Sequence, residues 1–220
     1  MEQSASRTEF GPNGLELLLN GPERGGLQVV LAHGAGQPMD APFMETVATG
    51  LAAEGFGVVR FEFPYMAARR ATGRKRPPDR VPVLSDVWRT VIRHLAPANL
   101  LIGGKSMGGR IASMVADEMA VDGLVCLGYP FHPPGRPEKR RVEHLAELQT
   151  PCLICQGDRD PFGKPEEVKS YQLSPTIDVH WIADGDHGFK PRKKSGRTEA
   201  QNVAQAILAI STFARSLCLR

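Results

Sequence analysis

Short apolar runs alternate along this chain with longer stretches in which apolar residues recur three or four positions apart. The continuous runs are typical of strands covered on both faces of a sheet, and the periodic stretches indicate helices with one buried face. The predicted strands are Leu15–Leu19, Leu27–Ala32, Gly57–Phe63, Asn99–Gly103, Gly123–Leu127, Pro151–Gln156 and Ile177–Ile182. The predicted helices are Pro42–Glu54, Val83–Leu95, Met107–Met119, Pro165–Tyr171 and Thr198–Leu217.

Strands that alternate with helices predict an α/β fold with a mostly parallel central sheet and helices on both of its faces. A chain of 220 residues fits one domain (1–220), because single cores stop growing only near about 250–300 residues. Pro64–Pro82 and Pro130–Arg141 are rich in proline and arginine, and we expect two long loops there and no separate lid domain. Residues 1–12 are expected to be a flexible N-terminus, and Leu15–Leu19 an edge strand.

Composition narrows the class of protein. Hydrophobic residues make up 41% of the chain, enough for a large core and too many for a disordered protein. The net charge of +3 is too small to indicate a nucleic-acid binder. The first ten residues contain no apolar signal-peptide core, and no apolar run approaches the ~18 residues that span a bilayer. We therefore expect a cytoplasmic protein without a membrane or nucleic-acid partner.

Cys152 and Cys155 form a C-x-x-C pair, a pattern that also occurs in zinc and redox sites. Here the pair falls inside the predicted strand Pro151–Gln156. Residues three apart on a strand point to opposite faces, so the two sulfurs are poorly placed to share a metal or to form a disulfide. We expect both to be reduced, buried packing residues, and we expect no metal or cofactor.

The strongest chemical signal is Gly104-Lys105-Ser106-Met107-Gly108, which lies between a predicted strand and a predicted helix. This G-x-S-x-G pattern in a strand–turn–helix setting is typical of the nucleophile elbow of α/β-hydrolases. The turn forces the serine into a strained conformation, and the two glycines avoid collisions with the neighbouring strand and helix. The motif predicts Ser106 as a nucleophile. A glycine-rich helix start with a capping serine is the alternative.

A serine hydroxyl needs a base to take its proton, and in this fold the acid and then the histidine follow the serine along the chain. His187 comes after the last predicted strand and is the candidate base; a surface or capping role is the alternative. Asp160 follows the strand Pro151–Gln156 and is the candidate acid, with Asp158 as the second choice. Asp184 and Asp186 lie close to His187 along the chain and are expected to shape its turn.

Two N–H donors are needed to bind the oxyanion of a tetrahedral intermediate. The backbone N–H of Met107, directly after the nucleophile, is one candidate. The second is expected from the loop His33-Gly-Ala-Gly36, where we choose Ala35, with Gly34 as the other possibility. His33 itself is expected to anchor this loop.

Beyond the elbow, several motifs resemble those of the small, lidless, dienelactone-hydrolase-like α/β-hydrolases. They are most similar to a family of bacterial predicted hydrolases that includes a regulatory subunit of the NSL histone-acetyltransferase complex. The matching segments are His33–Gly36, Phe61–Met66, Gly103–Gly109, Gly128–Gly135, Gln156–Gly163 and Gly185–His187. The resemblance implies this fold and the triad Ser106, Asp160 and His187. It implies no lactone substrate, because dienelactone hydrolases use a cysteine nucleophile.

Three loops at the carboxyl ends of the predicted strands hold 15 of the 27 Lys and Arg residues, within 64–80, 128–141 and 183–197. Ligands bind at these strand ends in open α/β sheets. One interpretation is that the charges merely keep the loops solvated. The other is an electropositive rim that attracts anionic esters or thioesters, with Arg69, Arg70 and Arg136 as candidate substrate ligands.

The sequence therefore predicts a serine hydrolase that cleaves a small carboxylic ester or thioester through an acyl-enzyme on Ser106. Two alternatives remain at this stage. One is a non-catalytic interaction module on the same scaffold, since fold alone does not define function. The other is an acyltransferase that uses the same three residues and an acceptor other than water.

Overall fold

The computed structural model of the chain describes residues 6–22 and 26–218. Its centre is a sheet of eight strands in the order β1-β2-β4-β3-β5-β6-β7-β8. The strands are β1 (Arg7–Phe10), β2 (Glu16–Asn20), β3 (Gln28–Ala32), β4 (Gly57–Phe61), β5 (Leu100–Lys105), β6 (Gly123–Leu127), β7 (Cys152–Gly157) and β8 (Ile177–Ile182). From β4 to β8 all neighbours are parallel, whereas β1 and β2 are antiparallel additions at one edge.

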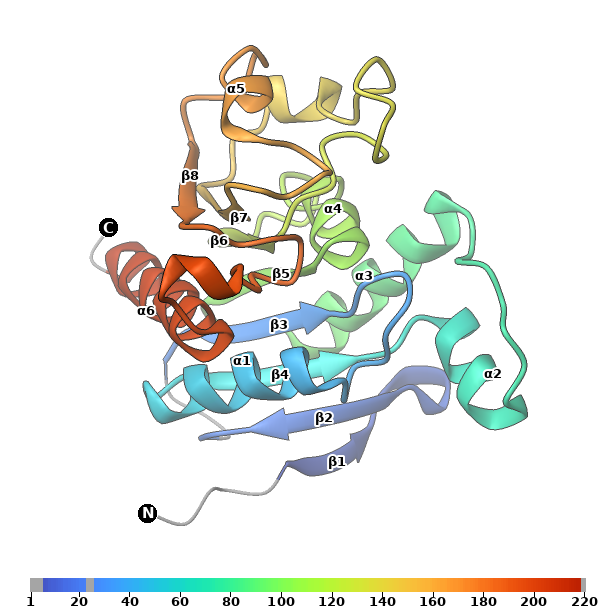
Figure 1. Cartoon of the computed structure of the whole chain (residues 1–220). Coiled ribbons are helices and arrows are strands. Elements are labelled where there is room, and N and C mark those ends of the chain that lie inside the picture. The colour runs from blue at the N-terminus through green and yellow to red at the C-terminus, as the bar shows by residue number, and fades with distance from the viewer. Residues whose placement is uncertain (1–5, 23–25, 219–220) are drawn as a thin grey trace.

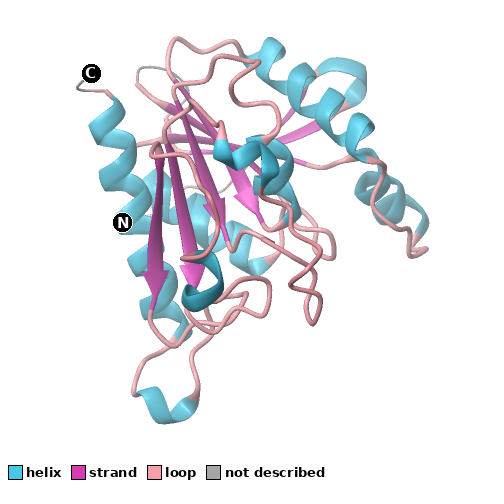
Figure 2. Ribbon diagram, turned by 90° about the horizontal axis from the view of Figure 1, so that it is seen from above, coloured by secondary structure: helices cyan, strands magenta, loops and turns pink. Residues whose placement is uncertain are grey.

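Helices cover both faces of this sheet, as the alternating pattern predicts. The α-helices are α1 (Pro42–Ala53), α2 (Pro64–Thr72), α3 (Val81–Leu95), α4 (Met107–Ser113), α5 (Pro165–Val168) and α6 (Glu199–Leu217), and the 3-10 turns are η1 (Pro12–Gly14), η2 (Glu143–Ala146) and η3 (Lys193–Ser195). Figure 1 shows α1 and α6 in front of the sheet and α3 and α4 behind it; the view from above in Figure 2 shows the strands between the two helical layers.

Two apolar cores lie on opposite faces of the sheet, because successive side chains of a strand point to opposite sides. On one face, Leu101 and Val125 pack with buried residues of α1 and α6. On the other, Ile102 and Leu124 pack with buried residues of α3 and α4. The strands between the two layers are buried on both faces, which explains their continuous apolar sequences.

The cysteines follow the same alternation. Cys152 belongs to the core under α3 and α4, and Cys155 to the core under α1 and α6. Both thiols are free and buried, and burial raises the pKa of Cys155 to about 12. The prediction that this C-x-x-C pair packs on opposite faces is confirmed.

Three expectations need correction. Arg7–Phe10 form β1, paired with β2, where we expected a flexible N-terminus, so β2 is not the edge strand; residues 1–5 lie outside the described residues. The expected loop Pro64–Pro82 contains α2, whose Tyr65 and Met66 are buried. The helix after the elbow ends at Ser113, six residues earlier than expected. Among the described residues, no helix is both long and apolar enough to cross a membrane.

The packing of α3 on the sheet gives a stability prediction. Trp88 is fully buried, and its ring meets that of Phe61 edge-on at 4.8 Å. Trp88→Ala should cost about 3–5 kcal/mol of unfolding free energy, because it leaves a large cavity. Val83→Ala, at an exposed position of the same helix, should change it by less than about 0.5 kcal/mol. Urea unfolding of both variants tests this; equal losses would contradict the packing described.

Candidate active site

The site is built around a strained turn between β5 and α4. Ser106 has φ 51° and ψ −113°, a conformation that a residue with a side chain rarely adopts. The neighbouring glycines make it possible: a Cβ on Gly104 would lie 2.1 Å from the Ala32 carbonyl oxygen, and one on Gly108 2.4 Å from the same oxygen. The Ser106 backbone N–H donates to Leu127 O at 3.0 Å, which ties the turn to β6. The elbow expected from the sequence is therefore present.

The structure brings Ser106, His187 and Asp160 together from three distant parts of the chain. Ser106 Oγ lies 2.9 Å from His187 Nε2, and His187 Nδ1 lies 2.8 Å from Asp160 Oδ2. Asp160 is fully buried, whereas His187 keeps 26% of its side chain exposed. Phe162 lies against the imidazole, with ring centroids 4.3 Å apart. A continuous hydroxyl–imidazole–carboxylate chain results.

The two candidate acids have different partners. Asp160 accepts hydrogen bonds from the Phe162 backbone N–H and from the Gln156 side chain, and it faces His187 Nδ1. Asp158 instead accepts from the Asp184 backbone N–H at 3.0 Å and so fixes the loop that carries the histidine. The geometry favours Asp160, the first choice from the sequence.

The loop after β8 is shaped by its own carboxylates, as expected. Asp186 Oδ1 accepts the backbone N–H groups of Gly188 and Lys190. Asp184 has φ 53° and binds the backbone and guanidinium of Arg192. These contacts hold His187 at the turn and leave neither carboxylate facing its Nδ1.

The loop after β3 lies beside the nucleophile. A Cβ built on Gly34 would be 3.7 Å from Ser106 Cβ. His33 is fully buried: its Nδ1 contacts Gly34 O at 2.7 Å, and its Nε2 accepts from the Phe63 N–H at 3.1 Å. Burial lowers the pKa of His33, so the ring is neutral and anchors the loop, as the sequence predicts. Tyr65 Oη donates to Ala35 O at 3.0 Å.

The contact with Tyr65 turns the carbonyl of Ala35 toward α2. Within the described residues, no hydrogen bond uses the backbone N–H of Gly34, Ala35 or Met107. All three N–H groups therefore remain as possible donors to an oxyanion. Gly34 is buried beside Ser106, while Ala35 is exposed.

The three arginines predicted as substrate ligands, Arg69, Arg70 and Arg136, have different contacts in the structure. The guanidinium of Arg70 pairs with Asp40 (2.7 Å) and Glu62 (2.6 Å), and so ties α2 to the loop after β3. These two carboxylates leave Arg70 little capacity to bind a substrate anion. Arg69 reaches Gly36 O at 3.4 Å. Arg136 is exposed in the turn that starts at Pro133.

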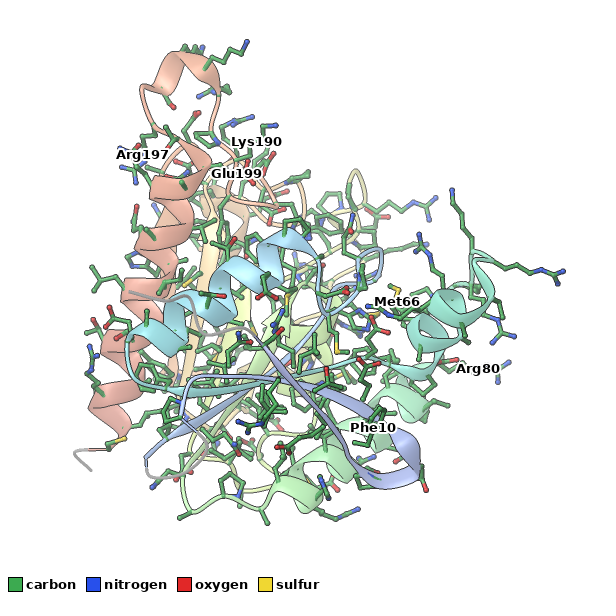
Figure 3. All side chains as sticks on the ribbon, turned by 90° about the horizontal axis from the view of Figure 1, so that it is seen from below. Phe10, Met66, Arg80, Lys190, Arg197 and Glu199 are labelled. Atoms are coloured by element: carbon green, nitrogen blue, oxygen red, sulfur yellow. The ribbon has the colours of Figure 1, made fainter. Side chains whose placement is uncertain are left out.

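Some residues of the basic loops are paired or lie apart from one another. Arg192 pairs with Asp184. Figure 3 shows Arg80 beside α2, well separated from Lys190 and Arg197 near the start of α6. A single electropositive entrance formed by all three loops therefore stays a prediction.

Sequence reasoning missed three residues that support the site. Lys105 Nζ donates to the His187 carbonyl at 2.5 Å and lies 5.5 Å from the centre of the Phe43 ring. Gly128 makes room for this ammonium: with φ 69°, a Cβ there would lie 2.8 Å from Lys105 Nζ. Gln156, fully buried, links Asp160 to the backbone of Tyr129. The sequence signal that could have revealed them is a polar residue near the end of an apolar strand, Lys105 in β5 and Gln156 in β7.

Burial lowers the pKa of Lys105 from 10.5 to about 8, although the negative charges of Asp160 and Asp186 oppose this shift. Part of the side chain still reaches solvent. The ammonium and its neutral amine therefore interchange close to physiological pH, next to the backbone of His187.

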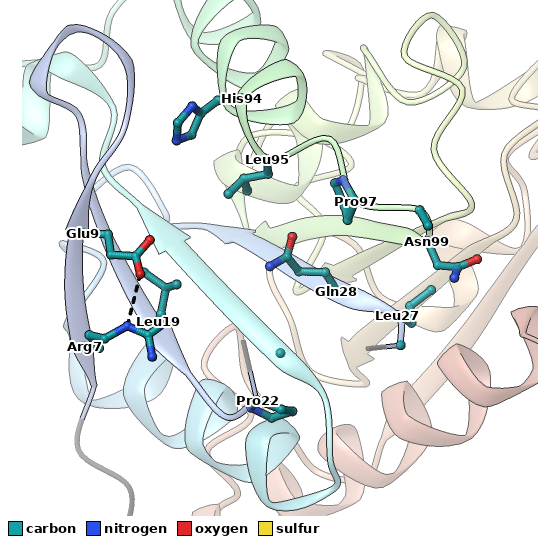
Figure 4. A pocket seen from close by; sticks show the side chains of 13 residues that line it. Arg7, Glu9, Leu19, Pro22, Leu27, Gln28, His94, Leu95, Pro97 and Asn99 are labelled. Atoms are coloured by element: carbon teal, nitrogen blue, oxygen red, sulfur yellow. Dashed lines mark hydrogen bonds and ion pairs between the residues drawn. The ribbon is translucent and has the colours of Figure 1, made fainter. Parts of the chain in front are cut away.

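A cavity of about 620 Å³ lies away from this site, at the amino ends of the parallel strands (Figure 4). Its lining includes Gln28, Gly57 and Asn99, at or next to the starts of three strands, and the Arg7–Glu9 ion pair at 3.1 Å. Ser106 follows the carboxyl end of β5, so the cavity is at the opposite end of the sheet. Among the described residues, no cluster of three His, Cys, Asp or Glu side chains is placed to bind a metal.

Comparison with known proteins identifies the class. A family model described as an alpha/beta hydrolase domain matches residues 26–215, and the chain belongs to this family. Among solved structures, an α/β serine hydrolase without lid from Xanthomonas campestris is 22% identical, with TM-score 0.67, covering 98% of this chain and 95% of that one. An α/β serine hydrolase homologue from Coxiella burnetii is also 22% identical, with TM-score 0.64, covering 95% and 98%.

A third structure, the esterase domain of a Rhodothermus marinus protein, is 16% identical, with TM-score 0.66 and coverage of 96% and 97%. These similarities extend over nearly the whole of each chain. The protein is thus a hydrolase-family member with a single-domain α/β-hydrolase fold.

The shifted pKa of Lys105 predicts a pH-dependent stability. In the unfolded chain the lysine keeps its proton up to about its ordinary pKa, whereas the folded protein releases it from about pH 8. Stability rises with pH wherever the unfolded state binds more protons. Between about pH 8 and 10.5, wild type should gain stability relative to Lys105→Met.

Urea unfolding of both proteins at several pH values measures this difference, with Lys139→Met as an exposed control that should follow wild type. A difference between wild type and Lys105→Met that stays constant from pH 7 to about 10.5 would contradict the burial of this ammonium.

Proposed function

We propose that this chain is a serine hydrolase that cleaves a small carboxylic ester or thioester through an acyl-enzyme on Ser106. The observation that carries the proposal is the chain of contacts Ser106 Oγ–His187 Nε2 (2.9 Å) and His187 Nδ1–Asp160 Oδ2 (2.8 Å). The esterase domain with the same fold is consistent with it.

In the proposed acylation step, Ser106 Oγ attacks the substrate carbonyl carbon while His187 Nε2 takes the hydroxyl proton. Asp160 keeps the proton of the imidazole on Nδ1 and stabilises the imidazolium that forms. Collapse of the tetrahedral intermediate breaks the bond to the leaving group, which receives the proton from His187 Nε2. An acyl group then remains on Ser106 Oγ.

Water enters for the second step, gives one proton to His187 and attacks the acyl carbon. Ser106 leaves with that proton, and the free acid is released. We assign the oxyanion hole to the backbone N–H of Met107 together with that of Ala35, or of Gly34 in its place. Met107 directly follows Ser106, Gly34 lies beside Ser106, and Ala35 follows Gly34 in the same loop. Within the described residues, no hydrogen bond uses any of these three N–H groups.

Two finer expectations remain part of this proposal. One is the resemblance of the motifs to the small, lidless, dienelactone-hydrolase-like hydrolases, and most of all to the family of bacterial predicted hydrolases that includes the NSL-complex subunit; this resemblance supplies no substrate. A cytoplasmic location is the second. A non-catalytic binding module on the same scaffold is the competing outcome of the labelling test below. An acyltransferase would use the same three residues and differ only in the acceptor of the acyl group.

Covalent labelling tests the nucleophile. A fluorophosphonate probe should label wild type and Ser170→Ala, a control at an exposed serine, but not Ser106→Ala. The reason is that only a serine with an adjacent base is reactive enough to attack the probe. Fluorescence of the denatured protein after gel separation gives the readout. No labelling of wild type would favour the non-catalytic binding module.

The acid is tested by a matched pair of substitutions. Asp160→Asn should lower kcat for an aryl ester by about 10³–10⁴-fold, because an amide in place of the carboxylate holds the imidazole in the wrong tautomer. Asp158→Asn removes a contact of the loop only and should cost less than tenfold. Similar losses in the two variants would contradict the assignment of Asp160.

A further inference from the structure

Two arginines next to the elbow have no acidic partner among the residues that the structure describes. Arg110 lies on α4, where its backbone N–H donates to Ser106 O at 3.0 Å, one helical turn from the nucleophile. Arg141 closes the loop after β6, where its N–H donates to Phe131 O at 2.8 Å. Within residues 6–22 and 26–218, neither guanidinium forms an ion pair or a hydrogen bond. Several other arginines do form ion pairs: Arg60, Arg70, Arg89, Arg159, Arg192 and Arg215.

A polar cluster joins the two arginines. Ser113 Oγ donates to Arg110 O at 2.7 Å and lies 2.8 Å from His144 Nε2. Tyr129 Oη donates to Arg141 O at 3.0 Å and lies 3.4 Å from the same His144 nitrogen. Figure 1 shows the segment after β6 passing beside α4. The imidazole of His144 therefore lies between the backbones of the two arginines.

Positive charge predominates around Arg110, Arg141 and His144. Burial lowers the pKa of Arg141, and the positive charge of Arg110 lowers it further. His144 behaves in the same way: burial lowers its pKa, Arg110 adds to the effect, and only the neighbouring Glu143 opposes it. Arg110 Nε is buried and has no hydrogen-bond partner in the described part of the chain. A buried donor without an acceptor is uncommon in proteins and costs free energy.

An oxyanion would balance the positive charge of the two guanidinium groups. A guanidinium is a planar fork that binds a carboxylate or a phosphate through two parallel hydrogen bonds. Arg110, Arg141 and His144 are all half-buried and not fully enclosed. By contrast, Arg70 already binds two carboxylates.

We propose that Arg110 and Arg141, with His144 between them, bind a carboxylate or phosphate group that the substrate of Ser106 carries. The substrate would then be an anionic ester or thioester, such as the monoester of a dicarboxylic acid. This inference rests on the proposed function for the identity of the ligand, but the anion site itself can be measured without turnover.

The first experiment compares two esters of similar length. The mono-p-nitrophenyl ester of succinic acid carries a carboxylate, and p-nitrophenyl butyrate does not. In Arg110→Gln and Arg141→Gln, kcat/KM for the succinate ester should fall about 10–100-fold, while that for the butyrate should stay within twofold. Arg110→Lys keeps the charge but not the fork, so its loss should be intermediate. Arg93→Gln, at an exposed position of α3, should match wild type.

The second experiment measures binding in Ser106→Ala, which cannot form an acyl-enzyme. Sodium succinate and inorganic phosphate are each titrated while the imidazole resonances of His144 are followed by NMR. A bound anion should raise the pKa of His144, and Arg110→Gln should abolish the rise. A larger effect of one anion than of the other tells a carboxylate from a phosphate site.

The outcomes separate the two proposals. Succinate or phosphate binding that depends on Arg110, without hydrolysis of either ester by wild type, supports the anion site and contradicts the proposed hydrolase. Hydrolysis of both esters with equal losses in Arg110→Gln, or with no loss, contradicts the anion site and leaves the hydrolase standing. Absence of any anion-dependent change at His144 also overturns the anion site.

Discussion

The backbone of Ser106 is the constraint on which the rest of the structure depends. A non-glycine residue with φ 51° and ψ −113° costs on the order of 1–3 kcal/mol and persists only where the surroundings enforce it. The surroundings here are the middle of the sheet. β5 lies between β3 and β6, and a Cβ on Gly103 would lie only 1.9 Å from Val125 O. Close packing at Gly103, Gly104 and Gly108 leaves the chain one path around the turn, and that path presents Ser106 Oγ at the carboxyl edge of the sheet.

The other two residues of the site reach the serine because parallel strands end at one edge. Asp160 follows β7 and His187 follows β8, so both arrive at the edge where β5 ends. Burial of Asp160 is sustained by donors on every side: the Phe162 N–H, the Gln156 amide and the imidazole. Lys105 then holds the His187 carbonyl from the elbow itself. The same strand thus positions Ser106 and, through Lys105, the backbone of His187.

Much of this arrangement can be predicted from the sequence because its signals are local. The apolar runs of β3, β5, β6 and β7 mark strands buried on both faces, and a G-x-S-x-G turn between strand and helix has one common use. What could not be predicted depends on tertiary contacts. β1 has four exposed residues and no apolar pattern, and α2 is a polar, arginine-rich helix held by the burial of Tyr65 and Met66.

The charges illustrate the same limit. A count of basic residues along the loops cannot show that Arg70 binds Asp40 and Glu62, which are 30 and 8 positions away in sequence. Nor can it show that Arg110 and Arg141 have no such partner within residues 6–22 and 26–218. Positive charge in a sequence becomes a binding site only where folding leaves it unpaired, and this depends on which carboxylates lie nearby.

The central claim is that Ser106 Oγ attacks the substrate carbonyl in an acyl-transfer reaction. The oxyanion hole of this proposed site is formed by Met107 and the loop after β3. A crystal structure of the protein after reaction with a small phosphonate inhibitor tests it most directly. The account predicts a covalent bond from Ser106 Oγ to phosphorus, with the phosphoryl oxygen accepting the N–H of Met107 and that of Ala35 or Gly34. A phosphonate attached elsewhere, or a phosphoryl oxygen directed away from these N–H groups, would contradict it.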